Sequence, residues 1–239
     1  MHLTSVIIVS ALAASAAAQP TIELLVPKDQ CVPVYDVHKM GCSFERFYTC
    51  EYQGETIQRA DTYGESGIQY IEFADMDGNP ISTWTPDGEN NILGVIDSPK
   101  RFALETLVEH GEDRFDLVLS ALHPWFADPV TEHFRGTVTL TGKILDVDGV
   151  AFHEAKLRGY SQINSFQDSF DRHYYFDLKT GAGVRGSDVP SGASDFDRSS
   201  YEPIKVVYPE HPDFQIDRPI YQCGVISLGP LETGPSKEG

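Results

Sequence analysis

The residues in this sequence that could do chemistry are its histidines, its acidic side chains, its cysteines and one series of aromatic residues. The tightest histidine grouping is Glu132-His133 with His153-Glu154. If these pairs lie on neighbouring strands and face each other, two imidazoles and two carboxylates could hold zinc or copper. Surface or hydrogen-bonded histidines are the simpler interpretation. A metal-binding protein or metal-dependent hydrolase, with His133 and His153 as ligands, is therefore an alternative function.

Two acidic turns invite a calcium interpretation. Both have the pattern D-x-D-G, over residues 75–78 and 146–149, and calcium prefers oxygen ligands. An EF-hand loop needs its glycine at the sixth position and a glutamate at the twelfth. Here the glycine comes fourth, and the twelfth residue counted from Asp75 is Pro86. Ordinary β-turns are favoured, and we expect no cofactor.

Nucleophilic catalysis has no recognisable motif in the chain. Neither G-x-S-x-G nor a cysteine beside a histidine occurs, although these are the arrangements that activate serine and cysteine nucleophiles. The chain has 36 acidic residues, so a pair of carboxylates picked from the sequence is no evidence for a catalytic site. The sequence therefore favours a role that is not enzymatic.

The aromatic series is the richest apolar feature of the C-terminal half. Its members are Phe166, Phe170, Tyr174, Tyr175, Phe176, Tyr201 and Tyr208. Such a series suits the core of a sheet. It also suits the lining of a cavity for an apolar ligand, in a curved sheet that opens to solvent. On the second interpretation the ligand-contacting residues are Phe166, Phe170, Tyr174 and Phe176.

Residues 1–18 have the pattern of a cleavable secretory signal. An uncharged, mainly apolar run from Val6 to Ala14 is followed by the small residues 15–18, which form an A-x-A cleavage site. Cleavage after Ala16 is an alternative. The run is shorter than the roughly 20 apolar residues of a membrane span. We expect a periplasmic or secreted protein that is not an integral membrane protein.

All four cysteines follow this signal: Cys31, Cys42, Cys50 and Cys223. An even number of cysteines in an exported chain predicts two disulfides. The strand-like segment between Cys42 and Cys50 would span about 26 Å, which is too far for a bridge between those two. We expect Cys31 to pair with Cys42 and Cys50 with Cys223. Zinc and redox sites are disfavoured because C-x-x-C does not occur.

Most of the remaining sequence alternates with period two between short polar turns, which is typical of antiparallel β structure. Turn residues such as Asp77-Gly78 and Asp148-Gly149 separate the segments. The sequence predicts a mainly β fold: one domain over residues 19–228, made of curved antiparallel sheet as a half-barrel or sandwich, with at most one or two short helices. A disordered tail is expected over 229–239. The predicted strands are 43–52, 56–63, 67–74, 80–85, 136–146, 150–160, 172–178, 182–186, 203–208 and 219–227.

The segment over residues 98–122 allows two interpretations. Ser98-Pro99 could begin a helix that runs to His110 and stops at Gly111. The same residues alternate in polarity, so a hairpin is the alternative. The start signal at Ser98-Pro99 and the stop signal at Gly111 together favour the helix. Residues 187–202 are expected to form a long loop.

Two stretches, VDGVAFHEAKL at 147–157 and RHYYFDLKTGAGVR at 172–185, resemble periplasmic half-barrel proteins of the lipoprotein-carrier type. Proteins of that type have an aromatic strand, a D-x-K-T-G turn and a return strand that ends in arginine. The resemblance implies a curved antiparallel sheet able to hold a hydrophobic ligand. It assigns no individual site residue.

The net charge of −18 limits the classes of partner. Such a surface repels nucleic-acid phosphates, whose binding depends on lysine and arginine, and it repels anionic lipid headgroups. We expect no nucleic-acid partner. The sequence predicts a soluble exported protein that binds an apolar ligand or an envelope partner through the concave face of its sheet. A structural or interaction module of the cell envelope is a further alternative.

Overall fold

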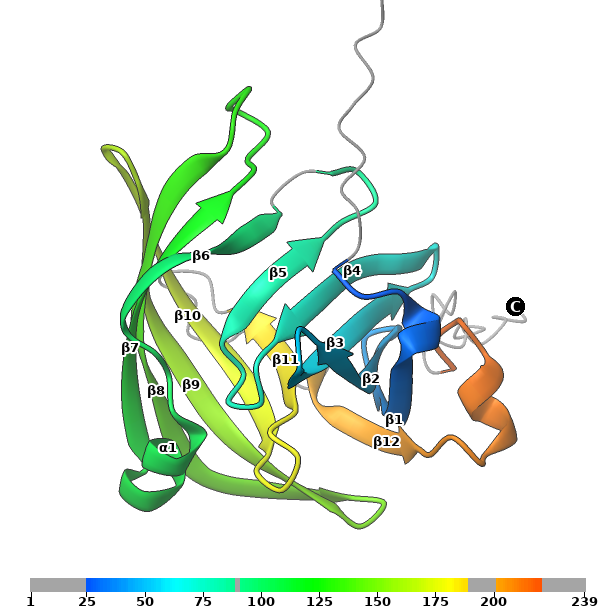
Figure 1. Ribbon diagram of the computed structural model, residues 1–239. Helices are drawn as coiled ribbons and strands as arrows, with labels where there is room; N and C mark the ends of the chain where they lie inside the picture. The colour runs from blue at the N-terminus through cyan, green and yellow to red at the C-terminus, as the bar shows by residue number, and fades with distance from the viewer. Residues whose placement is uncertain (1–24, 89–90, 189–200, 221–239) are drawn as a thin grey trace, which may run out of the picture.

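The structure is a computed structural model that describes residues 25–88, 91–188 and 201–220. Within these residues the chain forms two six-stranded antiparallel sheets and one short α-helix (Figure 1). The sheets do not close into a barrel. The predicted mainly β fold is therefore confirmed. The predicted signal over 1–18 and tail over 229–239 lie outside the described residues.

The first sheet has the strand order β12-β1-β2-β3-β4-β5. Its strands are β1 (Cys31–Lys39), β2 (Ser43–Tyr52), β3 (Glu55–Gly64), β4 (Gly67–Ala74), β5 (Pro80–Trp84) and β12 (Pro203–Val207). Strands β1 to β5 follow one another as a meander. Strand β12 returns to pair with β1, where Asp36 lies opposite Val207. Short 3-10 helices precede β1 (Lys28–Gln30) and follow β12 (Pro212–Gln215).

The second sheet has the order β11-β10-β9-β8-β7-β6. Its strands are β6 (Ile92–Lys100), β7 (Glu112–Ala121), β8 (Val130–Val147), β9 (Val150–Ile163), β10 (Phe166–Asp177) and β11 (Gly183–Asp188). The edge strands β5 and β6 of the two sheets lie next to each other. There the Ile92 amide donates to Thr83 Oγ1 at 2.7 Å.

Tight turns define the hairpins, as their residues predict. Gln53 and Gly54 between β2 and β3 have φ angles of 54° and 85°. Asp148 and Gly149 between β8 and β9 have φ angles of 51° and 84°. Positive φ at both central residues is the geometry that matches the twist of a two-residue hairpin. The D-x-D-G pattern over 146–149 is thus a hairpin turn.

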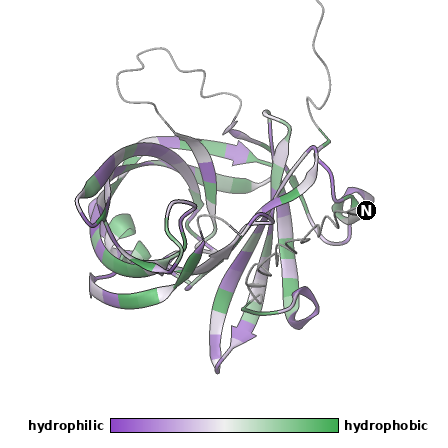
Figure 2. Cartoon of the chain, turned by 90° about the horizontal axis from the view of Figure 1, so that it is seen from above, coloured by the Kyte–Doolittle hydropathy of each residue, from purple (hydrophilic) through white to green (hydrophobic). Residues whose placement is uncertain are grey.

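The second sheet is strongly curved, and Figure 2 shows it curling round on itself. Two glycines lie directly opposite each other in the paired strands β8 and β9, Gly136 and Gly159. A Cβ atom at Gly136 would lie 2.6 Å from the Arg158 carbonyl oxygen and 2.7 Å from Phe115 Cζ. Glycine is therefore required here, because the backbones and the Phe115 ring approach closely.

The segment over 98–122 contains the favoured helix in a shorter form. The alternative hairpin is wrong in its first arm, whose residues form this helix, and its second arm lies in β7. Helix α1 (Leu104–His110) ends at Gly111, whose φ of 74° is the left-handed conformation expected of a C-terminal stop. The predicted start is wrong, because Ser98 and Pro99 lie in strand β6. Residues from 112 onward form β7. Strands β1 and β6 were not predicted, and most of the strand predicted over 219–227 lies outside the described residues.

A shared apolar core joins the two sheets. It includes Phe47 from the first sheet and Phe152 and Tyr175 from the second. Across the same interface the Tyr35 hydroxyl donates to Asp177 Oδ2 at 3.0 Å. The two sheets consequently form one folded body. No helix in the described residues is long and apolar enough to cross a membrane.

Candidate ligand-binding site

A cavity of about 190 Å³ lies beside this core and is bordered by both sheets. The first sheet contributes residues of β2 to β5, including Phe47 and Glu72. The second contributes residues of β6 to β11, including Leu157 and Tyr174. Because distant parts of the chain line it, the cavity exists only in the folded protein.

One wall of the cavity is apolar. It is formed by side chains from β7 to β10: Phe115, Leu117, Phe134, Val138, Leu157 and Phe176. The rings of this wall pack on one another, with centroids 5.1 Å apart for Phe115 and Phe134. The ring centroid of Phe102, just before α1, lies 6.1 Å from that of Phe176. Contacts of this kind hold the wall in a fixed shape.

Other residues that line the cavity are polar or charged. Glu72 and Tyr70 come from β4, Arg172 from β10 and Arg185 from β11. Period-two alternation places Glu72 and Tyr70 on the same face of β4. Burial raises the pKa of Glu72 from 4.5 to about 7, although the positive charges of Arg185 and Arg172 lower it. Its side chain keeps some accessible surface because it borders the cavity.

The aromatic residues proposed from the sequence share one face of β10, since they are separated by even numbers of residues and the strand pairs regularly with β9. Tyr174 and Phe176 line the cavity. Phe170 stacks on Phe134 with centroids 4.9 Å apart. Phe166 is 59% exposed and contacts Trp125 beyond the cavity. The four residues thus span β10 from its first residue to its last but one.

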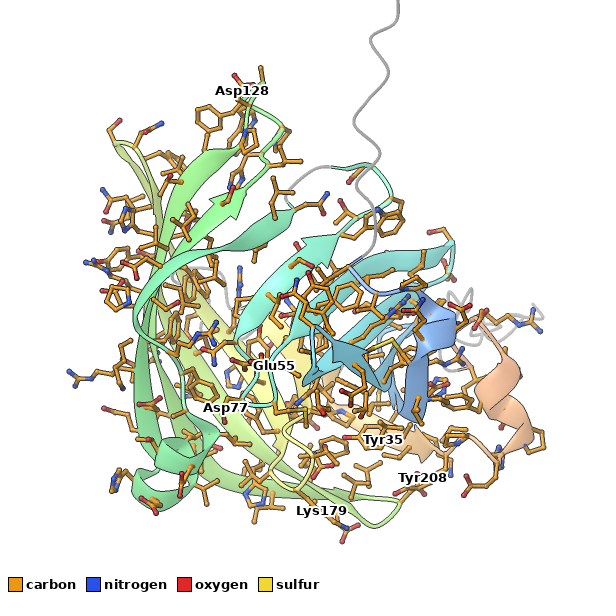
Figure 3. The ribbon with its side chains drawn as sticks, in the orientation of Figure 1. Tyr35, Glu55, Asp77, Asp128, Lys179 and Tyr208 are labelled. Carbon is orange, nitrogen blue, oxygen red and sulfur yellow. A yellow bond between two sulfur atoms is a disulfide. The ribbon has the colours of Figure 1, made fainter. Side chains whose placement is uncertain are left out.

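The two histidines proposed as metal ligands are not brought together. His133 lies opposite Gln162, whereas His153 lies opposite Ile144. Positions 133 and 144 are far apart along β8, at roughly 30 Å for this length of strand. His153 borders a separate surface hollow with Tyr35 and Tyr208. These two tyrosines are labelled in Figure 3. In the described part of the chain, no three histidine, cysteine or acidic side chains form a metal-binding group.

The carboxylates near those histidines have other partners. Glu132 lies 3.3 Å from His123 Nε2 and accepts a hydrogen bond from Ser161. Glu154 lies 3.2 Å from His173 Nδ1. These two carboxylates therefore contact histidines other than His133 and His153.

The acidic turns use their carboxylates within the turn or against a neighbouring strand. Asp75 Oδ1 accepts from the backbone amides of Asp77 and Asn79, at 3.1 and 2.9 Å. Asp148 Oδ2 accepts from the Val206 amide at 2.9 Å. These bonds support the β-turn interpretation over a calcium site.

The disulfide pairing differs from the predicted one. Cys31 and Cys50 lie directly opposite each other in β1 and β2 and form a disulfide, with Cα atoms 4.3 Å apart. The pairs Cys31–Cys42 and Cys50–Cys223 are therefore wrong. Cys42 is also disulfide-bonded, and Cys223 lies outside the described residues. The physical reason is that Cys31 begins a strand, which the sequence pattern does not reveal.

Comparison with known proteins identifies no relative. No protein-family model, no curated protein and no solved structure matches the chain. The cavity is therefore interpreted from its own residues. Sequence reasoning missed Glu72, Tyr70, Phe115 and Phe134, which lie in strands of ordinary alternating pattern.

Proposed function

We propose that this protein binds a small, mainly apolar ligand in the cavity between its two sheets, in an oxidising compartment outside the cytoplasm. The observation that carries the proposal is the cavity of about 190 Å³ with its preformed aromatic and aliphatic wall. Ligand sites are concave and mostly apolar, with a few convergent polar groups. The disulfide between Cys31 and Cys50 supports export.

The size of the cavity limits the ligand. An engineered apolar cavity of about 150 Å³ binds benzene. A cavity of about 190 Å³ therefore suits a body of one or two rings, or a short branched chain. Burial of that body against Phe134, Leu157 and Phe176 supplies the binding energy through removal of apolar surface from water.

Naphthalene is a suitable probe, with binding followed by its fluorescence and by calorimetry. The variant Val138→Trp places an indole in the cavity and should weaken binding at least tenfold. Val138 is buried and borders the cavity. Thr139, the next residue of β8, is exposed, so Thr139→Trp is a matched control that should leave binding unchanged.

A second filling variant, Leu157→Phe, adds less volume and keeps the test decisive if Val138→Trp does not fold. Wild-type protein that fails to bind naphthalene, or that binds it equally well in both filling variants, would contradict the proposal. Under that result an envelope partner, contacted through the exposed Trp125 and Phe166, becomes the better explanation.

A further inference from the structure

We infer that the natural ligand carries a neutral hydroxyl group, as an apolar alcohol or phenol does, and that this group donates a hydrogen bond to Glu72. The inference rests on the proposed function, because it names the class of ligand for the same cavity. It follows from three features: the position of Glu72, the charges around it, and the hydrogen bonds of the other polar groups in the cavity wall.

Glu72 lies in β4, the strand next to the edge strand β5 of the first sheet, and borders the cavity. In the register of β4 it lies between Ala60 of β3 and Thr83 of β5. Within the described residues its carboxylate accepts no hydrogen bond and forms no ion pair within 4.0 Å. Glu72 is half-buried and borders the cavity, so its oxygens remain open to a ligand there. A ligand that brings an O–H group to this position can donate a hydrogen bond to the carboxylate.

Other polar groups of the cavity wall already have partners. Asn79 Nδ2 donates to the Phe102 carbonyl oxygen at 2.9 Å, and Asn79 Oδ1 accepts from the Phe102 amide at 2.8 Å. Gln58 Nε2 lies 3.3 Å from the Thr180 carbonyl oxygen. Glu72 therefore differs from these side chains as a group available to a ligand.

The charges around Glu72 favour a neutral head group. Arg172 from β10 and Arg185 from β11 act on it as positive charges, and Glu45 from β2 acts as a negative one. Glu45 is itself paired with Lys39 Nζ at 2.6 Å. An ammonium or carboxylate group on the ligand would lose its hydration on entering the cavity, which costs free energy. A hydroxyl group can donate to the carboxylate without adding charge.

The test compares four probes that share one aromatic body: naphthalene, 2-naphthol, 2-naphthoate and 2-naphthylmethylamine. Each is titrated by calorimetry at a slightly alkaline pH, at which Glu72 is ionised and naphthol is still protonated. We expect 2-naphthol to bind about tenfold more tightly than naphthalene, which is the range of a hydrogen bond to a charged group. We expect the charged probes to bind less tightly than 2-naphthol.

The variant Glu72→Leu should bind naphthalene and lose the preference for 2-naphthol, so that the ratio of the two affinities falls to about one. Glu72→Gln should retain part of the preference, because its amide oxygen still accepts a hydrogen bond. Glu55, labelled in Figure 3, is exposed at the turn between β2 and β3. Glu55→Gln is the matched control and should leave the ratio unchanged.

Each outcome bears on a different claim. A tenfold preference that persists in Glu72→Leu overturns the assignment of Glu72. Tighter binding of the amine or of the naphthoate than of 2-naphthol overturns the ligand class. Failure of the wild-type protein to bind any of the four probes overturns the proposed function itself. If Glu72→Leu does not fold, loss of part of the preference in Glu72→Gln decides the role of Glu72.

Discussion

Buried charges in the first sheet are neutralised by close partners. Arg46 donates from Nε and Nη2 to the two carboxylate oxygens of Asp36, at 2.7 and 2.8 Å. Arg59 donates in the same way to Asp61, at 2.6 and 3.0 Å. Paired and hydrogen-bonded ions of this kind are tolerated inside proteins. Glu72 accepts no comparable bond from the described residues, which distinguishes a carboxylate available to a ligand from structural ones.

The raised pKa of Glu72 predicts how stability depends on pH. Burial raises this pKa from 4.5 to about 7, so the folded protein holds the proton more tightly than the unfolded chain does. The resulting stabilisation is complete below about pH 4.5 and is lost as the pH rises through about 7. A glutamine at position 72 does not ionise, so the variant Glu72→Gln does not lose this stabilisation as the pH rises. Relative to wild type, this variant should therefore gain roughly 1–3 kcal/mol of stability between pH 5 and pH 8.

Urea unfolding of both proteins at the two pH values measures this gain. Glu55→Gln is again the control, because an exposed glutamate should give a difference that does not change with pH. A constant difference between wild type and Glu72→Gln across the range would show that the Glu72 pKa is not raised in the folded protein.

At the scale of the element, the paired glycines Gly136 and Gly159 let β8 and β9 lie close together. A methyl group at position 159 would overlap the Arg135 carbonyl oxygen, and backbone cannot move aside as a side chain can. Gly159→Ala should cost roughly 2–4 kcal/mol of unfolding free energy. The same change at Gly94 in β6, where no atom lies within 4 Å of the added carbon, should change stability by less than about 1 kcal/mol.

Both variants are compared by denaturant unfolding, and naphthalene binding gives a second readout. Since β8 and β9 carry part of the cavity wall, Gly159→Ala should also weaken naphthalene binding, whereas Gly94→Ala should not. Equal stability of the two glycine variants would show that the close approach of β8 to β9 is not needed for the fold.

Elements with regular alternation and explicit turn residues were predictable from the sequence. Strands β2, β3 and β4 and the Gly111 helix stop are of this kind. Strand β1 was missed because Pro33 and the buried polar residues Asp36 and His38 interrupt its apolar pattern. Strand β6 was missed because Gly94 and Pro99 are typical of loops and are tolerated only at a sheet edge.

The candidate site was harder to predict than the fold. The aromatic face of β10 was recognisable, because even spacing puts Phe170, Tyr174 and Phe176 on one side of a strand. Glu72 was not, since a glutamate between apolar residues of a strand normally faces solvent. It faces a cavity here only because the second sheet covers that side of β4. This packing depends on contacts between distant segments, which local pattern does not encode.

At the scale of the whole molecule, the cavity depends on both sheets remaining together. Phe152 of β9 is fully buried in the core that they share, with Phe47 and Tyr35 of the first sheet. Removal of its ring should therefore destabilise both sheets at once. Phe152→Ala is expected to cost about 3–5 kcal/mol. Phe166→Ala, at an exposed phenylalanine of the same sheet, should cost less than about 1 kcal/mol.

Native-state hydrogen exchange tests whether the molecule unfolds as one unit. The most protected amides of β3, in the first sheet, and of β9, in the second, should exchange with the same free energy in wild type. In Phe152→Ala the exchange free energies of the β3 amides and of the β9 amides should fall by the same amount. If the β9 amides fall and those of β3 do not, the sheets unfold independently, and a ligand could be released by separation of the sheets while each stays folded. A common fall instead means that ligand bound between the sheets stabilises the entire protein, so its affinity can be read from the rise in global stability.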